Sequence, residues 1–183
     1  MNYGQVYYND VANGVGCRTA LFVSGCTHHC KGCFNEVTWD FNYGEPYTKE
    51  VEDDIIKSLE PSYIDGLTIL GGEPMEVVNQ KVVRSLLERI KREVPRATIW
   101  IYSGYTWDEL TDNSNRRCHS EDTMPILRML DVLVDGEFIE EKRDLMLRFR
   151  GSSNQRVIDV PASLDKGEIV LSRYNDRETS RMM

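Results

Sequence analysis

Short apolar runs along the chain alternate with longer amphipathic stretches. Each run is continuously apolar rather than alternating, and each is closed by glycine or by polar residues, as is typical of strands buried on both faces of a sheet. Four such strands are predicted, at Thr19–Ser24, Gly66–Leu70, Thr98–Tyr102 and Val132–Val134.

Helical periodicity fills the stretches between these runs. Val51, Ile55 and Leu59 recur every fourth residue behind Thr48, which can cap a helix, and Pro61 ends the pattern. A second helix is predicted over Asn79–Glu93, shorter ones from Trp107 and over Ile126–Leu130, a loop over Thr111–Thr123, and short strands at Val157–Val160 and Ile169–Leu171.

Strands that alternate with helices in this way predict an α/β fold built from βαβ units with a parallel sheet. The carboxyl ends of parallel strands meet at one edge, where ligands bind in such folds. The unusual residues of the chain follow the predicted strands, so we expect them to meet there: a cysteine-rich segment, Gly71–Glu73, Ser103–Tyr105 and Asp135–Gly136.

Length and charge narrow the class of protein. The 183 residues suit a single domain over 1–183, with a frayed tail expected over 172–183. The formal charge of −8 argues against partners rich in phosphate, so we expect neither nucleic acid nor an anionic membrane surface. No apolar run is long enough to span a bilayer, and Met1–Gln5 shows no secretory pattern. We therefore expect a cytoplasmic protein.

The cysteines carry the strongest chemical signal. There are five, and Cys26, Cys30 and Cys33 form a Cys-x3-Cys-x2-Cys segment directly after the first predicted strand. Three thiolates on one loop can hold three corners of an iron–sulfur cluster and leave one iron open for a substrate. A zinc site with His28 or His29 as fourth ligand and a redox pair of Cys30 with Cys33 remain alternatives.

A glycine-rich turn follows the second predicted strand. Gly71 and Gly72 allow the backbone to approach a ligand closely, and Glu73 offers a carboxylate that could bind an ammonium group. A plain turn would look the same, but this turn comes one βα unit after the cysteine loop.

Taken together, these motifs resemble the radical S-adenosylmethionine (SAM) superfamily. Within it, the chain is similar to the activating proteins of anaerobic (class III) ribonucleoside-triphosphate reductase over about Asn2 to Leu171. The segments that carry this resemblance are Asn13–Gly16 with Arg18, Leu21–Cys26, Cys30–Asn35, Val132–Gly136 and Arg150–Gln155.

The resemblance implies a fold, cofactors and a reaction. The fold would be an incomplete, open (β/α) barrel of the radical SAM type with a mostly parallel sheet. Cys26, Cys30 and Cys33 would ligate one [4Fe–4S] cluster, and the amino and carboxylate groups of SAM would chelate its fourth iron. The protein would be an oxidoreductase that cleaves SAM reductively and generates a glycyl radical on the reductase.

The same resemblance implies further site residues and partners. Backbone of Gly32, Cys33 and Phe34 would line the adenine, and Gly71, Gly72 and Glu73 would hold the methionyl ammonium. The partners would be the large reductase subunit and an electron donor of the flavodoxin or ferredoxin type. The main alternatives are an activase of the formate C-acetyltransferase (pyruvate formate-lyase) type and a non-catalytic zinc module.

Some residues receive no role at this stage. Cys17 and Cys118 match no motif, the function of Arg150–Gln155 stays open, and His28 and His29 are expected to be exposed loop residues rather than ligands.

Overall fold

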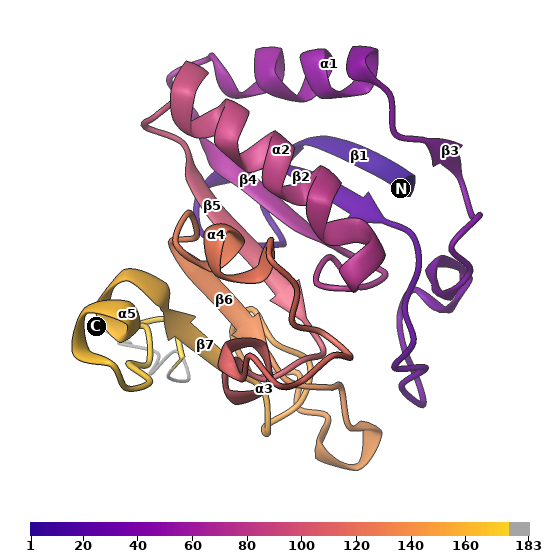
Figure 1. Cartoon of the computed structure of the whole chain (residues 1–183), viewed down its shortest axis with the longest axis vertical. Coiled ribbons are helices and arrows are strands. Elements are labelled where there is room, and N and C mark those ends of the chain that lie inside the picture. The colour runs from indigo at the N-terminus through magenta and orange to yellow at the C-terminus, as the bar shows by residue number, and fades with distance from the viewer. Residues whose placement is uncertain (176–183) are drawn as a thin grey trace.

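The computed structural model describes residues 1–175 and shows one seven-stranded sheet (Figure 1). Its strand order is β3-β1-β2-β4-β5-β6-β7. The strands are β1 (Asn2–Asp10), β2 (Cys17–Val23), β3 (Glu45–Pro46), β4 (Ile64–Gly71), β5 (Thr98–Ser103), β6 (Val132–Asp135) and β7 (Arg156–Asp159).

Among residues 1–175, five α-helices and two short 3-10 helices complete the fold. α1 and α2 lie across one face of the sheet, and α4 packs against α2 on the same side (Figure 1). The helices are α1 (Lys49–Leu59), α2 (Val77–Glu93), α3 (Trp107–Thr111), α4 (Thr123–Leu127) and α5 (Val160–Lys166), with η1 (Glu36–Trp39) and η2 (Glu140–Lys142). No helix in the described part of the chain has both the length and the apolar character needed to cross a membrane.

The central strands and the two long helices confirm the elements predicted from the hydrophobic pattern. The four predicted strands correspond to β2, β4, β5 and β6, and the two long helices to α1 and α2. β2 pairs in parallel with β4, β4 with β5, and β5 with β6, so their carboxyl ends share one edge. The large apolar core lies between this part of the sheet and the helices.

The expected open (β/α) barrel with a mostly parallel sheet is wrong. The sheet is mixed: β1 pairs antiparallel with both β2 and β3, and β6 pairs antiparallel with β7. Within the described residues β3 and β7 are the two edges of the sheet and do not pair with each other.

The length and path of the connections account for two of the three antiparallel pairs. A parallel pair needs a crossover of a dozen or more residues, usually with a helix. Residues 11–16 between β1 and β2 are too few, and residues 136–155 between β6 and β7 contain only η2 and return to the end of the sheet that they left. β1 was not predicted because none of its residues is buried and it lacks a continuous apolar run.

The C-terminal part of the chain confirms one predicted strand and reduces another. Val157–Val160 is a strand as β7, whereas the strand expected at Ile169–Leu171 is reduced to a bridge between Leu171 and Ile158. The expected frayed tail concerns mainly residues 176–183, which lie outside the described residues, while Ser172 N–H donates to Val157 O at 2.8 Å.

A buried guanidinium joins the strands at their amino-terminal ends. Arg18 is 1% exposed, and Nη2 donates to Leu67 O at 2.8 Å and to Thr98 O at 2.9 Å. Its Nε donates to Thr68 Oγ1 at 2.7 Å, and Nη1 donates to Thr98 Oγ1 and Val15 O. Burial lowers the pKa of Arg18 to about 10, so the group is still a cation at neutral pH. One side chain therefore ties β2, β4 and β5 to the loop before β2.

Replacing this cation should weaken the whole sheet. We expect Arg18→Met to lower the free energy of unfolding by about 2–4 kcal/mol, because each buried acceptor left unpaired costs about 1–3 kcal/mol. Urea denaturation followed by circular dichroism measures the change. The matched control, Arg92→Met, removes an exposed guanidinium from α2 and should leave stability almost unchanged; equal stability of the two variants would contradict the role given to Arg18.

Candidate functional site

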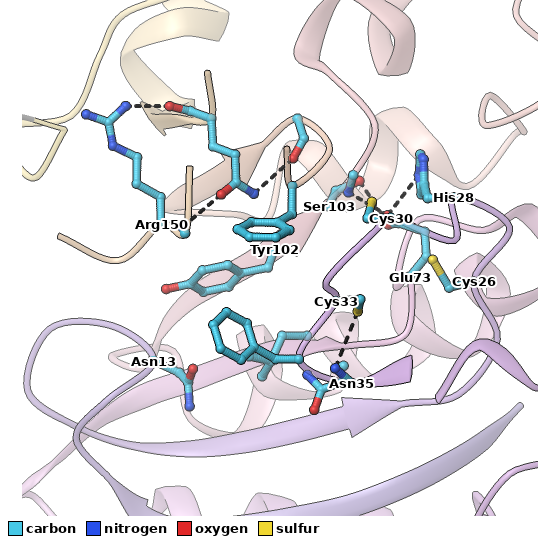
Figure 2. Close-up of a pocket in the computed structure, with 18 of the residues that line it drawn as sticks. Asn13, Cys26, His28, Cys30, Cys33, Asn35, Glu73, Tyr102, Ser103 and Arg150 are labelled. Atoms are coloured by element: carbon cyan, nitrogen blue, oxygen red, sulfur yellow. Dashed lines mark hydrogen bonds and ion pairs between the residues drawn. The ribbon is translucent and has the colours of Figure 1, made fainter. Parts of the chain in front are cut away.

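The loops after β2, β4, β5 and β6 meet at one edge of the sheet, as predicted from the parallel strands. They surround a cavity of about 570 Å³ (Figure 2). Phe22, Leu70 and Tyr102 lie side by side in adjacent strands and line it, on the face of the sheet away from α1 and α2. The cysteine loop and residues 136–155 contribute to its walls.

All three cysteines of the Cys-x3-Cys-x2-Cys segment line this cavity (Figure 2). Cys26 is buried, and Cys30 and Cys33 are half-buried. Each sulfur accepts a backbone N–H: from His28 and His29 at Cys26, from Phe138 at Cys30, and from Asn35 at Cys33, the last at 3.3 Å. Hydrogen bonds to the sulfurs are a main determinant of cluster potentials in iron–sulfur proteins.

The other two cysteines are elsewhere. Cys17 begins β2 at the opposite end of that strand, and its Sγ lies 3.9 Å from Asn9 Oδ1. Cys118 is fully buried in the apolar core, where its Sγ donates to Glu109 O at 3.4 Å. The structure thus separates the three clustered thiols from the two that matched no motif.

The three thiols have the chemistry of iron–sulfur ligands once they are ionised. Burial raises the pKa of Cys26 to about 12 and also raises the pKa of Cys30, so without a bound cation these thiols are neutral. Iron bound there would stabilise the thiolates. In the part of the chain that the structure describes, no three His, Cys, Asp or Glu side chains are grouped closely enough for a single metal ion.

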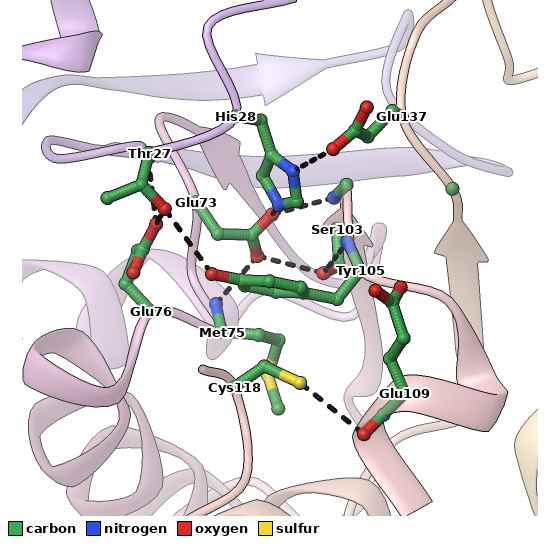
Figure 3. Close-up of polar contacts among 12 residues, drawn as sticks. Thr27, His28, Glu73, Met75, Glu76, Ser103, Tyr105, Glu109, Cys118 and Glu137 are labelled. Carbon is green, nitrogen blue, oxygen red and sulfur yellow. Dashed lines mark hydrogen bonds and ion pairs between the residues drawn. The ribbon is translucent and has the colours of Figure 1, made fainter. Parts of the chain in front are cut away.

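The two histidines needed by the zinc alternative are engaged elsewhere. His29 is exposed and stacks on Trp39, with ring centroids 4.7 Å apart. The side chain of His28 is only 2% exposed, so its expected exposure was wrong. His28 Nδ1 lies 2.6 Å from Glu137 Oε1, and Nε2 lies 3.3 Å from Glu73 Oε2 (Figure 3).

Glu73 is the most buried charged group of the site. Its carboxylate is 1% exposed, and Oε1 accepts from Met75 N at 2.8 Å and from Ser103 Oγ at 2.9 Å. Oε2 accepts from Gly104 N at 2.6 Å and faces His28 (Figure 3). Three hydrogen bonds and the ion-pair contact with His28 therefore surround the carboxylate, which has about four lone-pair positions. Glu73 therefore holds together the loops that follow β2, β4 and β5.

His28 fits closely into this arrangement. Its ring lies against Tyr105, with centroids 4.3 Å apart, and a Cβ added to Gly104 would lie 2.7 Å from the imidazole. Only glycine leaves room for the ring at that position. Burial lowers the pKa of His28, but the hydrogen bonds and charges of Glu73 and Glu137 outweigh it and raise the pKa overall.

A second carboxylate, that of Glu76, holds the three residues between Cys26 and Cys30 in place. Thr27 N–H and Oγ1 both donate to Glu76 Oε1, at 2.8 and 2.6 Å. Sequence reasoning missed His28, Glu76 and Glu137, because nothing in their local pattern distinguishes them from solvated loop residues. Of the three, only His28 lies within a motif that the sequence analysis recognised, the three-residue spacer between Cys26 and Cys30.

The other predicted site residues are divided between the cavity and its rim. Cys33, Phe34, Gly71 and Gly72 line the cavity, and Phe34 is 72% exposed. Gly72 packs so tightly that an added Cβ would lie 2.7 Å from Gly25 O. Gly32 is not among the lining residues and lies in an exposed turn near Glu140.

Comparison with known proteins gives a consistent result. A family model described as a 4Fe-4S single cluster domain matches residues 12–158. A protein of Vibrio cholerae serotype O1 is 46% identical over 157 residues, which cover 85% of this chain and 96% of that protein. Proteins of Escherichia coli K12 (42%, covering 86% and 97%) and of enterobacteria phage T4 (34%, covering 86% and 93%) are also similar. All three are named anaerobic ribonucleoside-triphosphate reductase-activating protein.

The close fit of His28 against Gly104 can be tested by a double-mutant cycle. Gly104→Ala should destabilise the protein strongly, since the new methyl group would clash with a ring held on both sides by carboxylates. In a His28→Ala background the same change should cost much less, with a coupling energy of about 0.5–3 kcal/mol, as for residues in contact. Urea unfolding of the four proteins gives this value. Additive effects would show that the ring does not occupy the space beside Gly104.

Proposed function

The chain belongs to the family of anaerobic ribonucleoside-triphosphate reductase-activating proteins, and on this premise we propose that it is a radical SAM activase. It would cleave SAM reductively and generate a glycyl radical on the reductase. The observation that carries this proposal is the placement of Cys26, Cys30 and Cys33 on one cavity together with the Gly71–Glu73 turn. The names of the relatives favour the reductase over pyruvate formate-lyase as the target.

Cys26, Cys30 and Cys33 would hold a [4Fe–4S] cluster. Three thiolates leave one iron without a protein ligand, which is the position that a substrate can take. Once reduced by an electron donor, a cluster held there would supply the single electron for reductive cleavage of the S–C5′ bond of SAM, and so for removal of a hydrogen atom from a glycine of the reductase. The backbone N–H groups at the three sulfurs would fix the thiolates and set their electron density.

SAM would lie in the cavity beside these thiols. We propose that Gly71, Gly72 and Glu73 hold its methionyl ammonium, and that backbone of Gly32, Cys33 and Phe34 follows its adenine. Glu73 lines the cavity, so its carboxylate would attract the ammonium through its charge while Oε2 keeps its contact with His28 Nε2 at 3.3 Å. The hydrogen bond from Gly104 N to the same oxygen would remain.

The cavity walls would protect the radical. Phe22, Leu70 and Tyr102 exclude water from the sheet side, whereas Phe34 at the rim is exposed. The reductase itself would close the open side, and its glycine-bearing segment would reach the cavity. A flavodoxin- or ferredoxin-type protein would supply the electron. A cytoplasmic location is proposed because the chemistry needs reduced thiols.

Substitution of the cysteines tests the proposed function. Anaerobic reconstitution with iron and sulfide should give about four irons and four sulfides per chain, the content of one cubane cluster. Cys26→Ala, Cys30→Ala and Cys33→Ala should each abolish SAM cleavage under a strong reductant and the glycyl radical signal that electron paramagnetic resonance detects on added reductase.

Cys17→Ala and Cys118→Ala serve as controls and should keep both activities, since their thiols lie away from the cavity. Full activity in any of the three cavity variants would refute the cluster assignment. An intact cluster that yields no radical on the reductase would refute the activase function.

The ammonium site makes a separate prediction. Glu73→Gln keeps the size of the side chain but removes its charge, and a hydrogen bond to a charged group contributes about 1.5–3 kcal/mol. We expect SAM affinity, measured by equilibrium binding to the reconstituted protein, to fall about 10- to 150-fold. Iron content serves as the control. An unchanged affinity would mean that Glu73 only joins the loops around it.

A further inference from the structure

The segment between β6 and β7, residues 136–155, forms a strap beside the cavity. Its base is closed by Gln155, whose Oε1 accepts from Gly151 N at 2.8 Å and Ser152 N at 3.1 Å. The Nε2 group of Gln155 donates to Gly136 O at 3.0 Å. The Arg150–Gln155 motif, whose role stayed open in the sequence analysis, thus fastens the strap to the end of β6.

Further contacts hold the two arms of the strap together. Ser153 N donates to Lys142 O at 2.9 Å, and Ile139 N donates to Ser152 Oγ at 3.2 Å. Ser152 is fully buried between the arms and also forms a β-bridge with Arg143. A closed base and paired arms present the tip between them as a fixed surface.

That tip is apolar and basic. Leu145 is 81% exposed and Met146 is 71% exposed, values like that of Phe34 at the cavity mouth, which is 72% exposed. Residues 142–148 contain three basic residues and one acidic residue, Asp144, in a chain whose formal charge is −8. Adjacent exposed apolar side chains of this kind mark interaction sites.

The tip adjoins the cysteine loop. The Arg143 guanidinium lies 5.5 Å from the centroid of the Phe34 ring, and Phe34 lies 6.0 Å from Phe138. Lys31 Nζ lies 2.9 Å from Glu140 Oε2. Arg143 and Leu145 also line the cavity, so Phe34 and the tip form one continuous rim at its mouth.

We propose that the strap tip, residues 142–148, is the docking surface for the anaerobic reductase, and that it binds an apolar patch edged by carboxylates on that protein. The inference rests on the proposed function, since a partner whose glycine reaches the cavity must pass this rim. The charge of the tip is opposite to that of the chain as a whole, so an acidic patch on the partner would be attracted here and repelled elsewhere.

Affinity for the purified, complete reductase tests the proposal, measured by anaerobic calorimetry with the reconstituted protein. The double variant Leu145→Ser with Met146→Ser should weaken binding by at least about 10-fold, as expected for apolar anchors of an interface. Lys142→Glu, at an exposed side chain, should weaken binding and reduce its dependence on salt concentration.

The matched controls lie near the amino-terminal ends of the parallel strands, at the other end of the sheet from the cavity. Tyr63 is 64% exposed just before β4, and Lys57 is exposed in the last turn of α1. Tyr63→Ser and Lys57→Glu should leave the affinity for the reductase within about 2-fold of the wild-type value, as for surface residues outside an interface. Equal affinities of the strap variants and these controls would overturn the docking surface.

A different result would refute the proposed function. If the wild-type protein with an intact cluster does not cleave SAM under a strong reductant, the activase function is wrong, whatever the affinity series shows. If it cleaves SAM and the strap variants bind the reductase as tightly as the wild-type protein, only the docking surface is wrong.

Discussion

The buried carboxylate of Glu73 is the interaction on which the site depends. A charge this deeply buried is tolerated only when hydrogen-bond donors surround it, and its donors come from separate loops. Met75 lies in the same turn as Glu73, Ser103 ends β5, and Gly104 follows that strand, while His28, which faces Oε2 as an ion-pair partner, belongs to the cysteine loop. None of these loops can shift without leaving the carboxylate uncompensated, so the position of the thiols is linked to the ends of β4 and β5.

A buried cation lies at the amino-terminal ends of the same strands. The Arg18 guanidinium is buried among carbonyl and hydroxyl oxygens of β4 and β5, and all its bonds run across strands or to the loop before β2. A cation near the amino-terminal ends and an anion at the carboxyl ends thus fix the register of the parallel part of the sheet. The stable scaffold and the site are made by the same four strands.

The site combines rigid and open parts. The spacer between Cys26 and Cys30 is held by Glu73, Glu76 and Glu137, whereas Phe34 and the strap tip stay exposed at the mouth. A preorganised inner wall suits a group that must be positioned accurately, and exposed apolar side chains suit a second protein. This division agrees with a family named for activating another enzyme.

Features that depend on local pattern could be predicted from the order of the amino acids. The sequence predicted β2, β4, β5 and β6, the long helices α1 and α2, and the meeting of the cysteine loop with the Gly71–Glu73 turn, because apolar runs and helical periodicity are local signals and parallel strands share an edge. The tertiary structure alone decided the antiparallel pairing of β1, β3 and β7, which replaced the expected barrel by a mixed sheet. It also decided the burial of His28, because contacts between its ring and Glu73, Gly104 and Glu137 join residues far apart in the chain, and no pattern of neighbouring residues encodes such contacts.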